Sequence, residues 1–200
     1  MLLPLSLTRN APFLVSILIG LCLTLAACDR EAPDAAQEHG ALQGEKPSLT
    51  GEIDAAMAGS LLPAVTLTDL EGNQINLAAL QGEPLLVNIW ATFCAPCKVE
   101  MPMLDDLAAD LEGEVRILTV SQDFKGSDAV GPYFARMQFK SLPSWIDQDG
   151  ALGLAVGSGV LPTTILYDAA GQEIWRVVGD YDWSSAEARE AILAALASEE

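Results

Sequence analysis

Histidine is almost absent from this sequence, which contains a single one, His39, among 200 residues. His39 lies in a stretch rich in Asp, Glu, Ala, Gly and Gln, a composition that is too polar to build a packed core. Catalysis by a histidine side chain is therefore not expected.

Basic residues are also scarce. The chain has 10 Lys and Arg against 28 Asp and Glu, which gives a formal net charge of −18. A surface this acidic repels the phosphates of nucleic acids and the headgroups of anionic lipids. Nucleic acid is therefore excluded as a partner, whereas the fold itself is hardly constrained by this charge.

Cysteines are too few for a disulfide-stapled scaffold. Of the four present, Cys22 lies inside an apolar N-terminal run and Cys28 ends that run, so only Cys94 and Cys97 fall in the segment that we expect to fold. Half of the residues are apolar, which is enough for a hydrophobic core. The length suits one domain of ordinary size with appendages.

Residues 1–27 have the pattern of an export signal. Arg9 is their only charged residue, and an uncharged apolar run extends from Ala11 to Ala27, which is shorter than the about 20 residues that span a bilayer. The run ends in Leu25-Ala26-Ala27-Cys28, which resembles a bacterial lipobox, in which the signal is cleaved before a cysteine that receives lipid. We therefore predict lipidation of Cys28, with an uncleaved membrane anchor as the alternative.

Residues 28–59 are interpreted as the lipidated N-terminus and a flexible linker. From residue 29 to residue 59 there is no aromatic residue, no valine and a single isoleucine, so little apolar surface is available to offset the entropy of ordering. Asp29 resembles the residue that keeps some bacterial lipoproteins on the inner membrane. Both alternatives for the N-terminus place the domain, residues 60–200, in the cell envelope, anchored to the cytoplasmic membrane and facing the periplasm.

Residues 60–200 alternate strand and helix patterns without an internal repeat, which predicts an α/β fold with a mixed sheet. Alternating apolar residues on both sides of a turn at residues 71–73 predict a hairpin over residues 62–77, and the apolar run at 84–90 predicts a central strand buried on both faces. The other expected elements are helices at 95–112 (interrupted by Pro102), 127–138 (beginning at Ser127 or Asp128), 150–156 and 184–197 (capped by Ser184 or Ser185), and strands at 115–120, 163–167 and 173–178.

Cys94 and Cys97 lie where the central strand gives way to a helix, and two intervening residues allow them to form a disulfide within one helical turn. The free amides and the dipole of a helix start favour an anion, which lowers the pKa of the first thiol, and the thiolate is the species that attacks disulfides. Cys97, one turn further in, would be more buried and would resolve the mixed disulfide. Pro96 has no N–H to donate and stiffens the helix start.

Two other roles for this pair are disfavoured. A structural zinc site takes four cysteine or histidine ligands, and the expected domain offers two cysteines and no histidine. A purely structural disulfide gains little from closing so short a loop, because the entropic gain grows with loop length. We expect a redox-active disulfide, no metal and no cofactor.

The string WATFCAPCKVEMP, residues 90–102, closely resembles the active-site segment of the TlpA/ResA/CcmG group of membrane-tethered thioredoxin-like proteins. Residues 160–164, VLPTT, resemble the second motif of that group, and Asp182-Trp183-Ser184 is similar to TlpA-type proteins in particular. The resemblance covers residues 60–197 and implies a thioredoxin-like fold, in which helices flank a mixed central sheet with an extra N-terminal β-hairpin. Phe93 stands where the group usually has tryptophan, so an aromatic residue is kept.

The resemblance also implies roles for particular residues. Pro162 matches a cis-proline that faces the disulfide and aligns a substrate chain. Glu100 matches an acid that assists proton exchange at the cysteines, although it could also be a solvated helix carboxylate. Trp90 matches the tryptophan before the site, where simple packing is the alternative. Four residues are expected to face the substrate, namely Trp90, Pro96, Leu161 and Thr163.

The implied activity is thiol–disulfide exchange, with the domain acting as a monomeric protein-disulfide reductase. Electrons would come from a membrane thiol–disulfide carrier and pass to disulfides of exported proteins, such as apocytochrome c or oxidase-assembly proteins. No histidine stands between Cys94 and Cys97, so the pair does not resemble that of strong thiol oxidants, which have a histidine there. Two alternatives remain: a peroxiredoxin-like peroxidase, which would use a lone low-pKa cysteine near an arginine, and a non-enzymatic lipoprotein that binds a partner or ligand.

Overall fold

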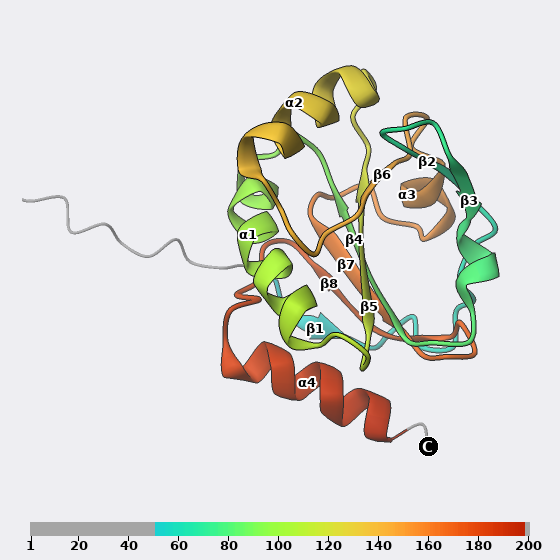
Figure 1. Ribbon diagram of the computed structural model, residues 1–200. Helices are drawn as coiled ribbons and strands as arrows, with labels where there is room; N and C mark the ends of the chain where they lie inside the picture. Colours follow the sequence, from blue (N-terminus) through green and yellow to red (C-terminus); the bar gives the residue numbers. More distant parts are fainter. Residues whose placement is uncertain (1–50, 199–200) are drawn as a thin grey trace, which may run out of the picture. The chain divides into compact units, whose positions relative to one another are not determined.

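The computed structural model describes residues 51–198, which build one eight-stranded sheet with helices on both faces (Figure 1). The strand order is β1-β8-β7-β4-β5-β6-β2-β3. The strands are β1 (Ile53–Asp54), β2 (Thr66–Asp69), β3 (Gln74–Asn76), β4 (Leu85–Trp90), β5 (Arg116–Ser121), β6 (Ser144–Ile146), β7 (Thr163–Tyr167) and β8 (Glu173–Val178). The helices are α1 (Ala95–Asp110), α2 (Ser127–Met137), α3 (Ala151–Ala155) and α4 (Ala186–Ala197), with a 3-10 turn, η1, at Leu77–Leu80.

Strand β4 runs through the middle of the sheet, and all six of its side chains are buried. Leu86 and Trp90 point into a core shared with α1, α2 and α4. Their neighbours Leu85, Val87 and Ile89 point into a second core beneath α3 and η1. Figure 1 shows α1 and α2 on one side of the central strands and α3 on the other. The continuous apolar run in the sequence is thus explained by burial on both faces.

The sheet is mixed, as predicted. β4 pairs with β5 in parallel and β5 with β6 in parallel, whereas β7 runs antiparallel to both β4 and β8. The N-terminal hairpin is present as β2 and β3, which join the sheet through an antiparallel pairing of β2 with β6. The thioredoxin-like α/β architecture predicted from the sequence is therefore confirmed.

The register brings three loops to one end of the sheet. Trp90, the last residue of β4, pairs with Ser121, the last residue of β5, and the carboxyl ends of parallel strands lie at the same edge. Thr163, the first residue of the antiparallel β7, pairs with Ile89 at that same end. The loops after β4, after β5 and before β7 therefore meet there, and both cysteines follow β4.

Some local predictions were wrong. The flexible linker was expected to reach residue 59, but Ile53 and Asp54 form β1 and pair with Val177 and Arg176 of β8. Backbone pairing at a sheet edge needs no large apolar side chain, which is why composition did not reveal this strand. Predictions for residues 1–50 lie outside the described residues.

One helix boundary differs from the prediction. α1 continues through Pro102, because that proline sits on an exposed face, where water can serve the carbonyl group that lacks a helical partner. α2 begins at Ser127, one of the two predicted starts, and Gly126 precedes it at the N-cap, where no side chain caps the helix. Ser185 caps α4 by accepting a hydrogen bond from the N–H of Ala188, as one of the two predicted alternatives requires.

Strand β6 was missed because it has only three residues and follows a proline. Such a segment carries too few alternating positions for a pattern to be recognised. Among residues 51–198, none of the helices combines the length and the apolar composition needed to cross a membrane.

Candidate active site

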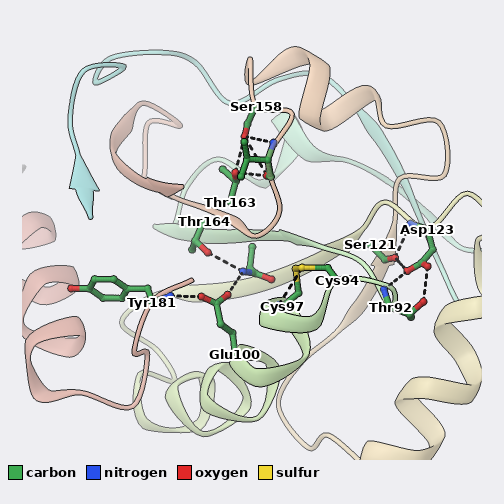
Figure 2. Close-up of a disulfide and its surroundings, with 12 residues drawn as sticks. Thr92, Cys94, Cys97, Glu100, Ser121, Asp123, Ser158, Thr163, Thr164 and Tyr181 are labelled. Carbon is green, nitrogen blue, oxygen red and sulfur yellow. Dashed lines mark hydrogen bonds between the residues drawn. A yellow bond between two sulfur atoms is a disulfide. The ribbon is translucent and has the colours of Figure 1, made fainter. Parts of the chain in front are cut away.

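The two cysteines lie at the start of α1 and are joined by a disulfide (Figure 2). Cys94 occupies the N-cap position, and its Sγ accepts a hydrogen bond of 3.2 Å from the backbone N–H of Cys97. Cys94 is 9% exposed and Cys97 is 1% exposed, so the prediction that Cys97 is the more buried of the two is confirmed. A thiolate formed on Cys94 would lie against the free amides of the helix.

Glu100 is buried one turn beyond Cys97, with 1% of its surface exposed. Its Oε1 accepts a 2.6 Å hydrogen bond from the backbone N–H of Tyr181, and its Oε2 accepts a longer one, 3.4 Å, from Nδ2 of Asn88. Asn88 in turn donates to Oγ1 of Thr164 at 2.9 Å. The alternative of a solvated helix carboxylate is therefore wrong, because Glu100 faces the sheet.

Burial raises the pKa of Glu100 from 4.5 to about 8, since removal from water disfavours the charged form. The hydrogen bond from Tyr181 opposes this shift, whereas the negative charge of Asp180 adds to it. The indole N–H of Trp183 also favours the carboxylate, although it is buried without a well-formed hydrogen bond. Near neutral pH this group can both hold and release a proton, which is what proton exchange with a thiol requires.

The turn that carries Cys94 is held by a second buried carboxylate, Asp123, which no sequence motif indicated. Its Oδ2 accepts hydrogen bonds from the N–H of Thr92 (2.7 Å) and from Oγ of Ser121 (2.8 Å), and its Oδ1 accepts one from Oγ1 of Thr92 (2.6 Å). The available signal was topological: Asp123 follows β5, and the residues after β5 adjoin those after β4.

The peptide bond between Leu161 and Pro162 is cis, as the resemblance implied. The loop before it is held by hydroxyl groups: Oγ1 of Thr163 donates to the carbonyl of Val160 at 2.8 Å and lies 2.7 Å from Oγ of Ser158. Thr163 is fully buried by these contacts. Its side chain therefore organises the loop, and the prediction that it faces the substrate is wrong.

Trp90 does not face the substrate either. It is fully buried and packs against Tyr133 and Phe134 of α2, with ring centroids 5.2 Å and 6.0 Å away. The packing alternative therefore holds for this residue. Pro96 is exposed and Leu161 is half-buried, and that these two face the substrate stays a prediction.

The large apolar side chains that are exposed in these loops are different ones. Phe93 is 63% exposed, Phe124 is 68% exposed, and their rings lie 6.4 Å apart between centroids. Val160, in the loop before Pro162, is 52% exposed. Sequence patterns could not show Phe124, because a single aromatic residue in a loop has no periodic partner.

Within the described part of the chain, no group of three or more His, Cys, Asp or Glu residues could hold a metal ion. The cysteine pair is engaged in its disulfide. The arrangement is that of a dithiol–disulfide centre whose first cysteine is the less buried of the two, with a fully buried second cysteine and a buried acid.

The sequence profile of the Redoxin family matches residues 57–192. The chain belongs to the Redoxin family. One relative is a thiol:disulfide interchange protein DsbE from Yersinia pestis, which is 34% identical over 68% of this chain and 71% of its own length. Another is a thiol-disulfide oxidoreductase ResA from Bacillus thuringiensis, 30% identical over 61% of this chain and 70% of its own length.

Solved structures give the same picture. A putative thiol:disulfide interchange protein DsbE from Chlorobium tepidum superposes with a TM-score of 0.63 over 70% of this chain and 97% of its own, at 23% identity, which bears on the fold alone. A putative thioredoxin from Neisseria meningitidis superposes with a TM-score of 0.60 over 74% of this chain and 94% of its own, at 29% identity. This Redoxin-family chain is a thiol–disulfide oxidoreductase, and Cys94 with Cys97 forms its CxxC pair.

Proposed function

We propose that this oxidoreductase works as a reductant of disulfide bonds in exported proteins. The observation that carries the proposal is the burial of Glu100 on the same helix as the cysteine pair, three residues after Cys97. Residues at this spacing are neighbours on a helix surface. A buried acid disfavours a thiolate beside it, through low polarity and through its own charge once ionised. A dithiol in which the Cys97 thiolate is disfavoured gives up its electrons more readily, the reverse of a strong oxidant with a stabilised reduced form.

The reaction begins with the reduced pair. The Cys94 thiolate attacks a substrate disulfide, forms a mixed disulfide and releases one substrate thiolate, which takes up a proton. Cys97 then loses its proton and attacks the Cys94 sulfur, which releases the second substrate thiolate and leaves the Cys94–Cys97 disulfide. Two electrons have passed to the substrate, and a dithiol donor must restore the pair. Glu100 is suited to accept the Cys97 proton because its pKa, about 8, lies close to neutral pH.

Access to the pair supports a polypeptide as the substrate. Cys94 is the more exposed sulfur, and Phe93, Phe124 and Val160 offer apolar surface on the loops at the same end of the sheet. Relatives are named for thiol–disulfide interchange. We include apocytochrome c and oxidase-assembly proteins as substrates, and a membrane thiol–disulfide carrier as the donor, because the sequence resembles the TlpA/ResA/CcmG group.

The location belongs to the same proposal. The apolar run before Cys28 and the small residues at positions 26 and 27 support export, cleavage and lipidation, which would tether the domain to the cytoplasmic membrane on its periplasmic side. A peroxidase is not favoured: it would use a lone cysteine beside an arginine, whereas Cys94 is paired with Cys97 and α1 contains no arginine.

Reduction of a polypeptide disulfide by the pre-reduced domain tests the activity. The wild type should reduce insulin, and Cys94→Ser should abolish the reaction. A non-enzymatic binding lipoprotein would show no such difference. The direction is tested by equilibrating the domain with glutathione buffers, where a reductant should remain oxidised in buffers as reducing as the cytosolic glutathione pool. Full reduction in a buffer as oxidising as the periplasm would exclude that direction.

The substrate is identified by trapping. Cys97→Ser stops the reaction at the mixed disulfide, because the resolving thiol is missing. When this variant is expressed in the native cell envelope, mass spectrometry of the trapped adducts should find exported proteins that contain cysteine pairs. Adducts restricted to cytosolic proteins would contradict the proposed location.

A further inference from the structure

Asp123 is a buried carboxylate that is held by the backbone and hydroxyl groups of neighbouring residues. It is 3% exposed, and all three hydrogen bonds to its carboxylate come from uncharged groups of Thr92 and Ser121. Burying a charge in this way is costly unless the donors are well placed, and those from Thr92, at 2.7 and 2.6 Å, are short. Specific hydrogen bonds therefore hold the Asp123 carboxylate in place beside the cysteine pair.

The residue that Asp123 holds is in the middle of the turn that leads to the nucleophile. Thr92 lies between Ala91 and Cys94, and the N–H of Cys94 closes this turn on the carbonyl of Ala91 at 3.1 Å. Figure 2 shows Asp123 and Thr92 on the side of the disulfide opposite Glu100. The two carboxylates thus have separate partners. Glu100 lies one helical turn beyond Cys97, and Asp123 accepts a hydrogen bond from the backbone of Thr92, two residues before Cys94.

The position of the turn matters for the chemistry of Cys94. Its sulfur is useful as a nucleophile only while it lies against the first amides of α1, where the N–H of Cys97 donates to it. Strand β4 ends at Trp90 and α1 begins at Ala95, so four residues set the place of the sulfur. Such a short connection loses its alignment when the contact that orders it is removed.

We propose that Asp123 is a positioning residue for thiol–disulfide exchange: its carboxylate fixes the Thr92 turn and thereby keeps Cys94 Sγ on the helix N-terminus. This inference deepens the proposed function and rests on it. Asp123 acts through Thr92 and does not touch the substrate. Because Asp123 binds both the N–H and the hydroxyl of Thr92, it fixes the orientation of the turn as well as its distance from the end of β5.

Four substitutions separate the effect of the hydrogen bonds between Asp123 and Thr92 from the effect of the negative charge of Asp123. Asp123→Ala removes all three contacts, and Thr92→Val removes the hydroxyl bond while the charge stays. In Asp123→Asn the amide oxygen still accepts from Thr92 and Ser121, and the amide nitrogen can donate to the Thr92 hydroxyl. Thr92→Ser keeps the hydroxyl and is the mild control.

The chain offers a matched control in Asp105 of α1. Its half-buried carboxylate accepts hydrogen bonds from the backbone N–H groups of Lys140, Ser141 and Leu142, at 3.1, 2.8 and 3.1 Å. It clamps a loop with the same chemistry, but it lies about 16 Å further along the helix axis than Cys94. Asp105→Ala therefore measures how much stability is lost when a carboxylate that holds a loop away from the cysteines is removed.

The measurement is the pH dependence of Cys94 alkylation in the reduced protein, together with the rate of insulin reduction and the thermal melting temperature. We expect Asp123→Ala and Thr92→Val to raise the apparent pKa of Cys94 and to slow exchange, on the order of tenfold for Asp123→Ala. Asp123→Asn and Thr92→Ser should stay within about twofold of wild type. Asp105→Ala should melt earlier with an unchanged alkylation profile.

Two results would overturn the inference. One is a wild-type alkylation profile in Asp123→Ala and Thr92→Val, with only a loss of stability like that of Asp105→Ala, which would make Asp123 a structural clamp. The other is equal damage in Asp123→Asn and Asp123→Ala, which would assign the effect to charge. If Asp123→Ala does not fold, the pair Thr92→Val and Thr92→Ser decides. Alkylation needs no protein substrate, so it distinguishes this inference from failure of the proposed reductase function.

Discussion

The backbone N–H of Tyr181 donates a 2.6 Å hydrogen bond to Oε1 of Glu100, although 81 residues separate them. This contact ties the segment between β8 and α4 to the helix that carries the redox pair. It also gives the buried carboxyl group a specific partner in its ionised form. Burial nevertheless outweighs the hydrogen bond, because the pKa of Glu100 rises to about 8.

Removing the charge of Glu100 should stabilise the oxidised protein at alkaline pH. The pKa of Glu100 is raised in the folded state, so the contribution of this group to the stability of the wild type is fully present below about pH 4.5 and is lost as the pH rises through 8. Glu100→Gln keeps an acceptor for Tyr181 and cannot ionise. We expect a gain on the order of 2 kcal/mol in the free energy of unfolding at pH 8.5, vanishing near pH 4.5.

Urea unfolding at several pH values measures this difference. The exposed Glu190 of α4 offers the control, and Glu190→Gln should change stability by less than about 0.5 kcal/mol at every pH. A Glu100→Gln advantage that stayed constant between pH 4.5 and 8.5 would show that ionisation of Glu100 is not responsible.

The same substitution should change the chemistry of the reduced pair. A carboxylate one turn from Cys97 raises the pKa of that thiol, so Glu100→Gln should lower it and change the exchange rate near neutral pH. Because the two groups titrate together, the readout is the whole pH–rate profile of insulin reduction. Identical profiles for wild type and Glu100→Gln would remove Glu100 from the proton path and leave water to accept the proton.

Cys94 should react first when the reduced protein is alkylated at mildly acidic pH. It caps α1 and is the more exposed of the two sulfurs, whereas Cys97 is buried. Thiolate character and access act in the same direction here. Peptide mapping after brief treatment with iodoacetamide should find the label on Cys94, and preferential labelling of Cys97 would reverse the assignment of nucleophile and resolving thiol.

Phe124 should contribute to the capture of polypeptide substrates. Its ring is 68% exposed beside Phe93, and covering such a ring is worth about 1–2 kcal/mol. Phe124→Ala should therefore lower kcat/KM for insulin about fivefold to twentyfold and leave the reduction of a small aromatic disulfide within about twofold.

Leu61 provides the control for this experiment. It is 70% exposed and bridges to Gln172, in the turn between β7 and β8, at the opposite end of β7 from Pro162. Leu61→Ala should leave both substrates unaffected. Equal losses of activity toward insulin and the small disulfide in Phe124→Ala would mean that Phe124 supports the loop and does not hold substrate.

Lipidation of Cys28 is tested on the membrane-bound protein. The short apolar run that ends in Ala26 and Ala27 predicts cleavage before Cys28. Mass spectrometry should find an N-terminal peptide that begins at residue 28 and carries acyl chains, and Cys28→Ser should release the protein from the membrane. An intact N-terminus at Met1 would establish the uncleaved anchor instead.

Part of the site could be predicted from the sequence because it depends on local spacing. The distance of three residues between Cys94 and Cys97, and their place between an apolar run and a helix, determine a disulfide at a helix start with its second sulfur buried. The central strand, the hairpin and the last helix likewise follow from the periodicity of apolar residues over several positions. Short pieces without such a period, β1 and β6, were missed.

The tertiary structure alone decided what surrounds the two sulfurs. Whether Glu100 faces water or the sheet depends on how α1 rotates against Asn88 and Tyr181, which lie far from it in the chain. Asp123 reaches Thr92 only because β4 and β5 run parallel and end at one edge. Trp90 and Thr163 were expected to face the substrate, Trp90 with packing as the alternative, but both are fully buried. Hydrogen bonds and burial between distant segments have no counterpart in local spacing, so the sequence determined the reaction and the packing determined which side chains tune it.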